Sequence, residues 1–246
     1  MTLAPGEVNP MSTAAQLARF VQEELKKVAD PEKAPQMQAY LKTDMPMYGV
    51  QKPDRVPIYR EMKARFTPRN QVEYEERVLA LWALPHREEK YAGITYACQH
   101  RDFQTTTSVP LYERLIREGA WWDFVDTIAI DLVGQVFLTE RAAMNPVIDG
   151  YVTDDNMWIR RTALIAHNKH KGQTDEERLF DHCLRLAPEK EFFIRKAIGW
   201  ALREYSKTAP GVVRGFLQEN RDQLSGLSYR EGAKHLVRAG DMEKGS

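Results

Sequence analysis

Two adjacent tryptophans and two aspartates lie within the short segment GAWWDFVD, residues 119–126. Apolar residues then recur at helical spacing up to Val136, which predicts a helix with a buried apolar stripe. We expect Asp123 to be the N-cap of this helix. Trp122 and Asp126 are four residues apart and so share one face, with Asp126 in the first turn, where the helix dipole favours its ionised form. An aromatic surface and a carboxylate would therefore face the same place.

The same segment also allows a purely structural interpretation, in which the two indoles are core anchors or a hydrophobic staple and Asp126 is a solvated acid. Later segments carry further aromatic and basic side chains. Trp158 precedes Arg160 and Arg161, and Trp200 follows Lys196 by four residues on the same side of a helix. Together they would form a groove with an acid, indoles and several cations. The alternative is a solvated helix face with Trp158 and Trp200 in the core between helices.

These side chains are expected on an all-α scaffold. Helical patterns begin at Thr13, with a first helix predicted over 13–30, and no run alternates with period two for long, so strands are absent or minor. Four similar helical segments recur about 35 residues apart and place charged residues in matching positions: Lys90, Asp126, Arg161 and Lys196. Such a period predicts a HEAT-like α-solenoid, an α-α superhelix whose inner helices line a concave groove. Asp126 and Arg161 should be neighbours in that groove.

Length and composition fit an ordinary globular protein. The chain has 246 residues, 43% of them hydrophobic and 28% charged, and its formal net charge is zero, so no overall field indicates nucleic acid. Residues 151–246 carry 17 Lys and Arg against 14 Asp and Glu, a surplus of 3 that permits a basic face. We expect a flexible lead-in over 1–11, one solenoid domain over 12–240 and a flexible tail over 241–246.

Several site classes are disfavoured by the sequence. Cys98 and Cys183 are the only cysteines, which argues against a disulfide framework or a cysteine zinc site and fits a reducing compartment. His167 and His170 lie one helical turn apart, but no further ligand at a convincing spacing completes a metal site. No stretch approaches eighteen consecutive apolar residues and no signal-peptide core is present. We expect a soluble, unexported protein.

Three segments, in this order, resemble the AlkD family of DNA glycosylases: WWDFVD at 121–126, WIRRTALIAHNKHK at 158–171 and FFIRKAIGWALREYSK at 192–207. The resemblance covers most of the chain after about residue 14, including MQAYLKTDMPMYGVQKPDR at 37–55. It implies a HEAT-like solenoid that excises positively charged N3- and N7-alkylated purines, such as 3-methyladenine and 7-methylguanine, from duplex DNA in base excision repair. It also implies that no cofactor or metal is needed and that the lesion stays stacked rather than flipped.

The resemblance further implies roles for single residues. Trp122, Asp126, Arg161 and Trp200 match the active-site set of the family. Asp126 would stabilise the cationic sugar and help position water, and the two indoles would cup the deoxyribose. Arg161 would hold a backbone phosphate.

Other residues are expected to contact DNA. By resemblance, Tyr40 and Gln51 would approach the duplex from the minor groove, although a core tyrosine and a turn glutamine are the alternative. Four cations complete the expected DNA-binding set: Arg160, Lys169, Lys171 and Lys196. A solvated helix end is the alternative for the run that contains Lys169 and Lys171.

The functional expectation is therefore a monomeric glycosylase, cytoplasmic and nucleoid-associated, that acts on double-stranded DNA and not on membranes. The competing hypothesis is a non-catalytic HEAT-like module that binds nucleic acid or protein through the same groove.

Overall fold

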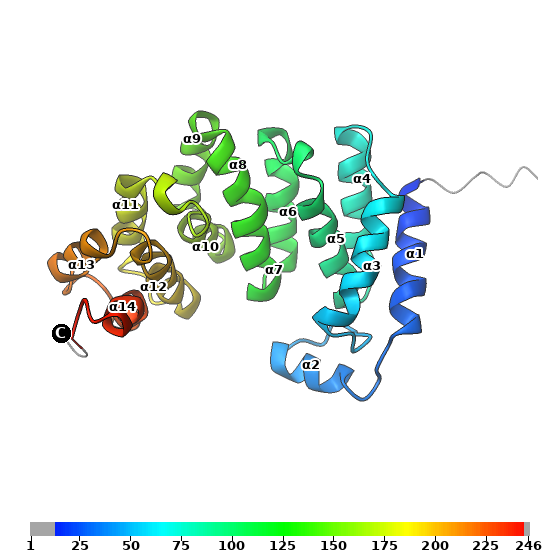
Figure 1. The fold of residues 1–246 in the computed structure, drawn as a ribbon, viewed down its shortest axis with the longest axis horizontal. Coiled ribbons are helices and arrows are strands. Elements are labelled where there is room, and N and C mark those ends of the chain that lie inside the picture. The colour runs from blue at the N-terminus through cyan, green and yellow to red at the C-terminus, as the bar shows by residue number, and fades with distance from the viewer. Residues whose placement is uncertain (1–12, 244–246) are drawn as a thin grey trace, which may run out of the picture. The chain divides into compact units, whose positions relative to one another are not determined.

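The computed structural model describes residues 13–243, and every regular element among them is a helix (Figure 1). This confirms the predicted all-α, helical-repeat fold. By contacts between Cα atoms the chain divides into two compact units, the first within residues 1–103 and the second within residues 104–246. The single domain over 12–240 stays a prediction. The expected lead-in over 1–11 lies outside the described residues.

Between residues 13 and 103, the first unit contains five α-helices and one 3-10 turn: α1 (Thr13–Lys27), α2 (Ala34–Leu41), α3 (Lys52–Arg65), α4 (Gln71–Trp82), α5 (Arg87–Gln99) and η1 (Arg101–Phe103). Helix α1 packs against α3, α4 and α5. Its apolar side chains at helical spacing, Leu17, Val21 and Leu25, are completely buried. The helix ends at Lys27, three residues earlier than predicted.

A buried carboxylate shapes the loop between α2 and α3. Glu88 is completely buried and accepts hydrogen bonds from the backbone amides of Tyr48, Gly49 and Val50, at 3.1, 2.9 and 3.1 Å. Gly49 has a φ of +80°, and a Cβ atom there would lie 2.0 Å from the carbonyl oxygen of Asp30, so only glycine fits. The loop leads directly into α3, and Glu88 and Gly49 therefore set the backbone that precedes this helix.

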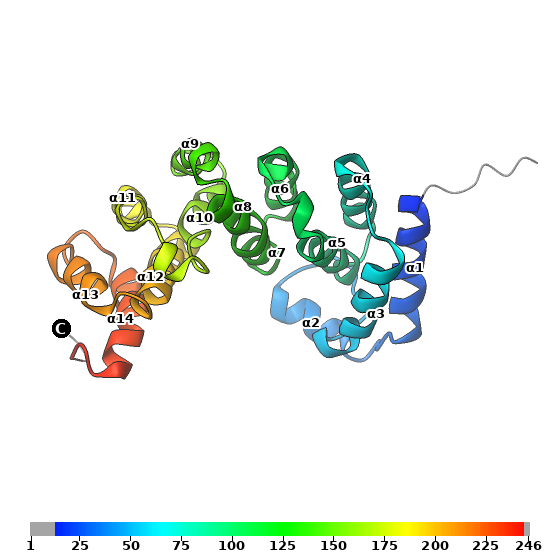
Figure 2. The same cartoon turned by 45° about the horizontal axis from the view of Figure 1, so that its top comes forward.

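The second unit contains the remaining helices: η2 (Thr106–Ser108), α6 (Val109–Gly119), α7 (Trp122–Thr127), the π-helical segment η3 (Ile128–Val133), α8 (Gly134–Thr139), α9 (Arg141–Tyr151), α10 (Met157–Ile165), η4 (Lys171–Gln173), α11 (Glu176–Leu186), α12 (Phe192–Ser206), α13 (Pro210–Glu219) and α14 (Gly226–Ala239). Helices α7, α10, α12 and α14 follow one another in space, each in contact with the next (Figure 2). Of the other helices, α6 packs against α7 and α10, α9 against α10, α11 against α10 and α12, and α13 against α12 and α14. The repeated unit is therefore a helix pair.

The continuous helix 122–139 is made of α7, η3 and α8. Its predicted apolar stripe is confirmed, because all six residues are completely buried: Val125, Ile128, Ala129, Leu132, Val133 and Val136. The predicted N-cap is wrong. Ala120 has a left-handed backbone that ends α6, so the helix begins at Trp122 with Trp121 as N-cap. Asp123 is the acid of the first turn and Asp126 lies beyond it, which removes the helix-dipole argument for Asp126.

At the other end of the second unit, the chain stays packed past α14. The amide of Asp241 donates to the carbonyl of Leu236 at 2.8 Å, and Met242 is buried. Over residues 13–243, none of the helices combines the length and the apolar character that spanning a bilayer requires.

Candidate active site

Trp122, Asp126, Arg161 and Trp200 all line one open cavity of about 400 Å³ in the second unit. They come from three successive helices of the row, α7, α10 and α12. The lining is completed by four residues of α12: Phe192, Phe193, Lys196 and Arg203. The repeat spacing predicted that Asp126 and Arg161 would be neighbours, and the structure places them in direct contact.

Arg161 holds the carboxylate of Asp126 in a bidentate pair. Its Nε donates to Oδ1 at 2.7 Å and its Nη2 donates to Oδ2 at 2.9 Å. Nη1 donates to the carbonyl oxygen of Phe193 at 2.6 Å, so one guanidinium connects α7, α10 and α12. Arg161 is only 3% exposed. The planar fork of arginine fits a carboxylate in one orientation, and Asp126 is therefore held rigidly.

The side chain of Asp126 is largely buried. Burial raises the pKa of this carboxyl above its ordinary value, and it outweighs the lowering effect of the hydrogen bonds and charge of Arg161. The side chain of Asp126 nevertheless keeps 18% of its surface exposed where it lines the cavity. A carboxylate in such surroundings interacts more strongly with a nearby positive charge than it would in water.

The tryptophans divide between the lining of the cavity and a cluster of aromatic rings around Phe193. Trp122 and Trp200 line the cavity, and the guanidinium of Arg161 lies 5.8 Å from the ring centroid of Trp200. Trp121 and Trp158 instead pack against Phe193. The distance from the ring centroid of Phe193 is 5.6 Å to that of Trp121 and 4.9 Å to that of Trp158. The structural interpretation of the indoles therefore describes the buried Trp158 and the partly buried Trp121, while Trp122 and Trp200 line the cavity.

Two cations follow the wall of the cavity on either side of Trp200. Lys196 lies one turn before Trp200 on α12 and Arg203 one turn after it. Both contact Glu231 of α14, at 2.8 and 2.5 Å, and Lys234 also pairs with this carboxylate. Burial alone would raise the pKa of Glu231, but the hydrogen bonds from these cations lower it to about 2. Glu231 is therefore ionised at neutral pH.

Sequence reasoning missed Arg203, Glu231 and the exposed ring of Phe192, which is 57% exposed at the cavity. Arg203 could have been found, because it follows Trp200 by three residues and so shares its helical face. Glu231 could not, because its contact with α12 depends on the packing of α14.

Arg160, one of the residues expected to bind DNA, is occupied within the protein. Its Nε and Nη2 donate to Glu189 at 2.6 and 3.1 Å. Its Nη1 donates to the carbonyl oxygens of Asp154 and Asp155. Arg160 does not line the cavity that contains Asp126, and Lys169, which pairs with Asp131, does not line it either.

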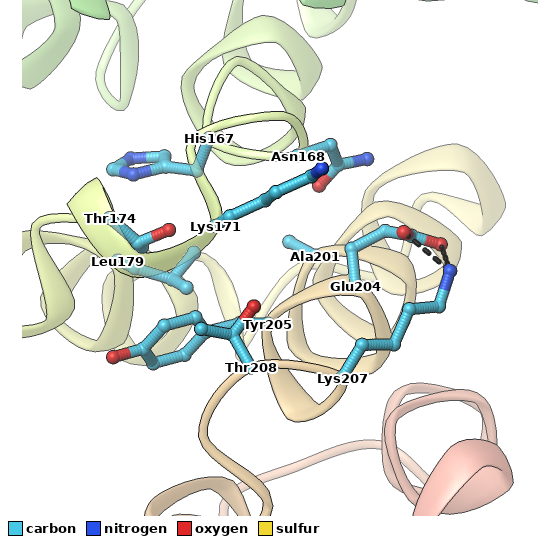
Figure 3. A pocket seen from close by; sticks show the side chains of 10 residues that line it. All are labelled: His167, Asn168, Lys171, Thr174, Leu179, Ala201, Glu204, Tyr205, Lys207 and Thr208. Carbon is cyan, nitrogen blue, oxygen red and sulfur yellow. Dashed lines mark hydrogen bonds and ion pairs between the residues drawn. The ribbon is translucent and has the colours of Figure 1, made fainter.

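Lys171 lies at a second cavity of about 210 Å³, between the end of α10 and the end of α12 (Figure 3). The residues around it are His167, Asn168, Lys171, Thr174, Leu179, Ala201, Glu204, Tyr205, Lys207 and Thr208. One side is formed by the ion pair between Glu204 and Lys207 (Figure 3). Burial lowers the pKa of His167 well below its ordinary value, so this imidazole is neutral. In the described part of the chain, no three side chains form a cluster that could hold a metal ion.

Tyr40 and Gln51 belong to the first unit. Tyr40 lies on α2 and is 74% exposed, so it is not the core tyrosine of the alternative interpretation. Gln51 is the exposed N-cap residue of α3, and its side chain makes no capping hydrogen bond. Their proposed contacts with DNA stay predictions.

Comparison with known proteins identifies the family of this chain. The family model described as "DNA alkylation repair enzyme" matches residues 21–236. A solved structure, a predicted DNA alkylation repair enzyme from Enterococcus faecalis, is 28% identical, with a TM-score of 0.79 over 85% of this chain and 97% of that chain. No curated protein matches. Because the family model spans most of the chain, including every residue that lines the cavity at Asp126, this protein belongs to the DNA alkylation repair enzyme family.

Proposed function

We propose that the protein is a DNA glycosylase that hydrolyses the N-glycosidic bond of N3- and N7-alkylated purines in duplex DNA. The substrates would be positively charged bases such as 3-methyladenine and 7-methylguanine. The observation that carries this proposal is the carboxylate of Asp126, which Arg161 holds rigidly at a cavity shared with Trp122 and Trp200. Family membership supports alkylated DNA as the material on which this site acts.

The reaction suits a site with one fixed carboxylate. An alkylated purine already carries a positive charge, so the electrons of its C1′–N bond leave with the base and neutralise it, and little acid catalysis is needed. The sugar becomes cationic in the transition state, and the Asp126 carboxylate stabilises that charge. Water then bonds to C1′, and its proton passes to Asp126 or to solvent. The reaction requires neither a metal nor a cofactor, because the charged base leaves without further activation and no oxidation or reduction takes place.

The size of this stabilisation follows from Coulomb's law. A unit charge pair about 4 Å apart at an effective dielectric near 20 is worth about 4 kcal/mol, or about a thousandfold in rate. The bidentate pair with Arg161 neutralises part of the charge of Asp126, which makes this an upper value. The rings of Trp122 and Trp200 add to it, because the negative face of an indole attracts a cationic sugar.

The open cavity supports recognition without base flipping. Flipping enzymes enclose the extruded base in a fitted pocket, whereas this cavity is open to solvent and its lining offers side chains suited to sugar and phosphate. Selectivity would then arise from the lability of the charged base. We expect tolerance of different alkyl groups and poor activity on neutral lesions.

Arg161 would act first by orienting Asp126. Three of its five N–H groups are engaged with Asp126 and Phe193, which leaves two N–H groups for a phosphate oxygen. Lys196, at the cavity wall, is the stronger candidate for a phosphate contact, because its side chain is 36% exposed.

The test is the release of free 7-methylguanine from a duplex that contains this base at one position. With protein in excess, we expect first-order release that leaves an abasic site, no release of guanine from the unmodified duplex, and slow release of a neutral lesion. Binding of the methylated duplex without release would overturn the proposal in favour of a non-catalytic binding module.

A further inference from the structure

Glu231 occupies an unusual position for an acid. It is 5% exposed, and three cations surround it: Lys196 and Arg203 from α12 and Lys234 from its own helix, α14. Two of these cations line the cavity at Asp126, while Lys234 does not. Glu231 itself does not line the cavity, so any effect on a ligand there must act through Lys196 and Arg203.

The spacing on α12 shows what Glu231 arranges. Lys196, Trp200 and Arg203 are separated by four and three residues, so they follow one face of the helix, with the indole between the two cations. Lysine and arginine have long, flexible side chains that sample many rotamers when they are free. A single carboxylate that accepts from both restricts them to the wall beside Trp200.

The close approach of α12 and α14 brings Glu231 within reach. A Cβ atom on Gly199 would lie 2.3 Å from the Cβ of Glu231 and 2.7 Å from the carbonyl oxygen of Ser228. The absence of a side chain at Gly199, next to Trp200, therefore lets α14 pack directly on α12. Glu231 then extends to the cation on either side of this contact.

We infer that Glu231 is a positioning residue, which holds Lys196 and Arg203 on either side of Trp200 so that they bind the DNA phosphates that flank the alkylated nucleotide. This inference rests on the proposed function. The charges agree with it, because Lys196 and Arg203 at the wall carry two positive charges against the one negative charge of Glu231. Because both cations are already arranged before DNA binds, less side-chain entropy is lost when the complex forms.

A purely structural role, in which Glu231 only joins α14 to α12, makes a different prediction. Glu231→Gln removes the negative charge that pairs with the two cations of the wall, so the affinity of the variant for unmodified duplex should stay the same or increase. If Glu231 positions the cations, the rate of base release at saturating protein should fall by about tenfold or more, because misplaced contacts cost rate after binding. If it only joins the helices, the folded variant should release base at the wild-type rate.

The experiment compares wild type, Glu231→Gln and Lys234→Met under single-turnover conditions at a temperature where all three are folded. Lys234→Met is the matched control, since it removes an ion pair with the same carboxylate but none from the cavity wall, and it should keep the wild-type rate. Binding is measured separately on plain duplex and on duplex with a stable abasic-site analogue. The ratio of the affinity for the analogue duplex to the affinity for the plain duplex should be about tenfold lower in Glu231→Gln than in wild type.

A second set of variants keeps the test decisive if Glu231→Gln folds poorly. Glu231→Asp, whose shorter side chain cannot reach both cations equally, should show an intermediate loss. Where Glu231→Gln does fold, it should have no further effect on the rate in a Lys196→Met, Arg203→Met background, because its effect acts through these two cations.

The outcomes separate this inference from the proposed function. If the wild type releases the base, and Glu231→Gln keeps both the rate of release and the binding preference for the abasic-site analogue, the positioning role alone is overturned. Wild type that releases no base but prefers the abasic-site analogue, with that preference lost in the variant, would overturn the glycosylase proposal and support the positioning role. Wild type that binds both duplexes equally would overturn both.

Discussion

Arg161 and Asp126 come from helices α10 and α7 and form a two-point contact, with Nε–Oδ1 and Nη2–Oδ2 distances of 2.7 and 2.9 Å. The same guanidinium donates to the carbonyl of Phe193 on α12. The pair is largely buried at its arginine end and open to the cavity at its carboxylate end. A contact that joins three helices thus also orients the group proposed to stabilise the transition state.

Asp126→Asn should reduce base release by about 10²–10³-fold, because the amide carries no charge to stabilise the cationic sugar. The affinity for DNA should be largely kept. Single-turnover release of 7-methylguanine measures the effect. Asp123→Asn is the control, since Asp123 is the neighbouring acid of the same helix and does not line the cavity. Equal rates in Asp126→Asn and wild type would remove Asp126 from the mechanism.

Arg161→Met should lower the free energy of unfolding by about 3 kcal/mol, because it leaves the Asp126 carboxylate in a poorly hydrated place without its partner. Urea unfolding measures this loss. Arg117→Met removes a more exposed pair with Asp154, whose side chains are 42% and 22% exposed, and should cost under about 1 kcal/mol. A similar small loss in both variants would show that the pair with Asp126 contributes little to stability.

The rate of base release should fall as the pH falls through the pKa of Asp126. The ionised carboxylate is the active form, and burial raises this pKa above the ordinary value, so the decrease begins at a higher pH than for an exposed aspartate. Arg161→Met removes the effect that lowers this pKa, and the acidic limb should move to still higher pH. The pH dependence of single-turnover release, corrected for spontaneous base loss, tests both statements. An acidic limb that is unmoved in Arg161→Met would contradict them.

Gly199→Ala should destabilise the protein by about 1–3 kcal/mol and also slow base release, because the new Cβ pushes Glu231 and its helix away from α12. Gly215→Ala in α13 is the matched control. Nothing lies within 4 Å of a Cβ there, and replacement of a helical glycine should stabilise by about 0.5–1 kcal/mol. Thermal unfolding and base release are measured on both variants, and equal stabilities would contradict the close approach at Gly199.

Glu88→Gln should loosen the loop before α3 and cost about 1–3 kcal/mol, because an amide has one acceptor oxygen where the carboxylate has two. Amide hydrogen exchange at Tyr48, Gly49 and Val50 should become faster. Glu32→Gln, at an exposed acid of the same unit, should change neither quantity. Unchanged exchange in Glu88→Gln would show that the loop holds without the carboxylate.

Periodicity in the sequence was sufficient to predict the helices and part of the candidate site. The apolar stripe from Val125 to Val136 is buried as its spacing predicted, because a helix places every third or fourth residue on one face. Asp126 and Arg161 are 35 positions apart and meet, because successive helix pairs stack in register. The quoted motifs were also sufficient to predict the family to which the chain belongs.

Local sequence patterns gave a wrong prediction where the start of a helix depended on the path of the preceding backbone. The N-cap expected at Asp123 lies two residues earlier, because the left-handed backbone of Ala120 ends α6 and lets the next helix start at once. Adjacent residues of one type also could not be told apart. Trp121 packs against the rings of Trp158 and Phe193 while Trp122 lines the cavity, and Arg160 pairs with Glu189 while Arg161 pairs with Asp126.

The amino-acid sequence by itself determined which residues share a helical face and which segments repeat. Only the tertiary structure decided which face meets which partner. Glu231 reaches Lys196 and Arg203 because α14 packs directly on Gly199, and no pattern within α12 or α14 contains that contact. The physical reason is that helical period is a property of neighbouring residues, whereas ion pairs between helices depend on the packing of side chains far apart in the chain.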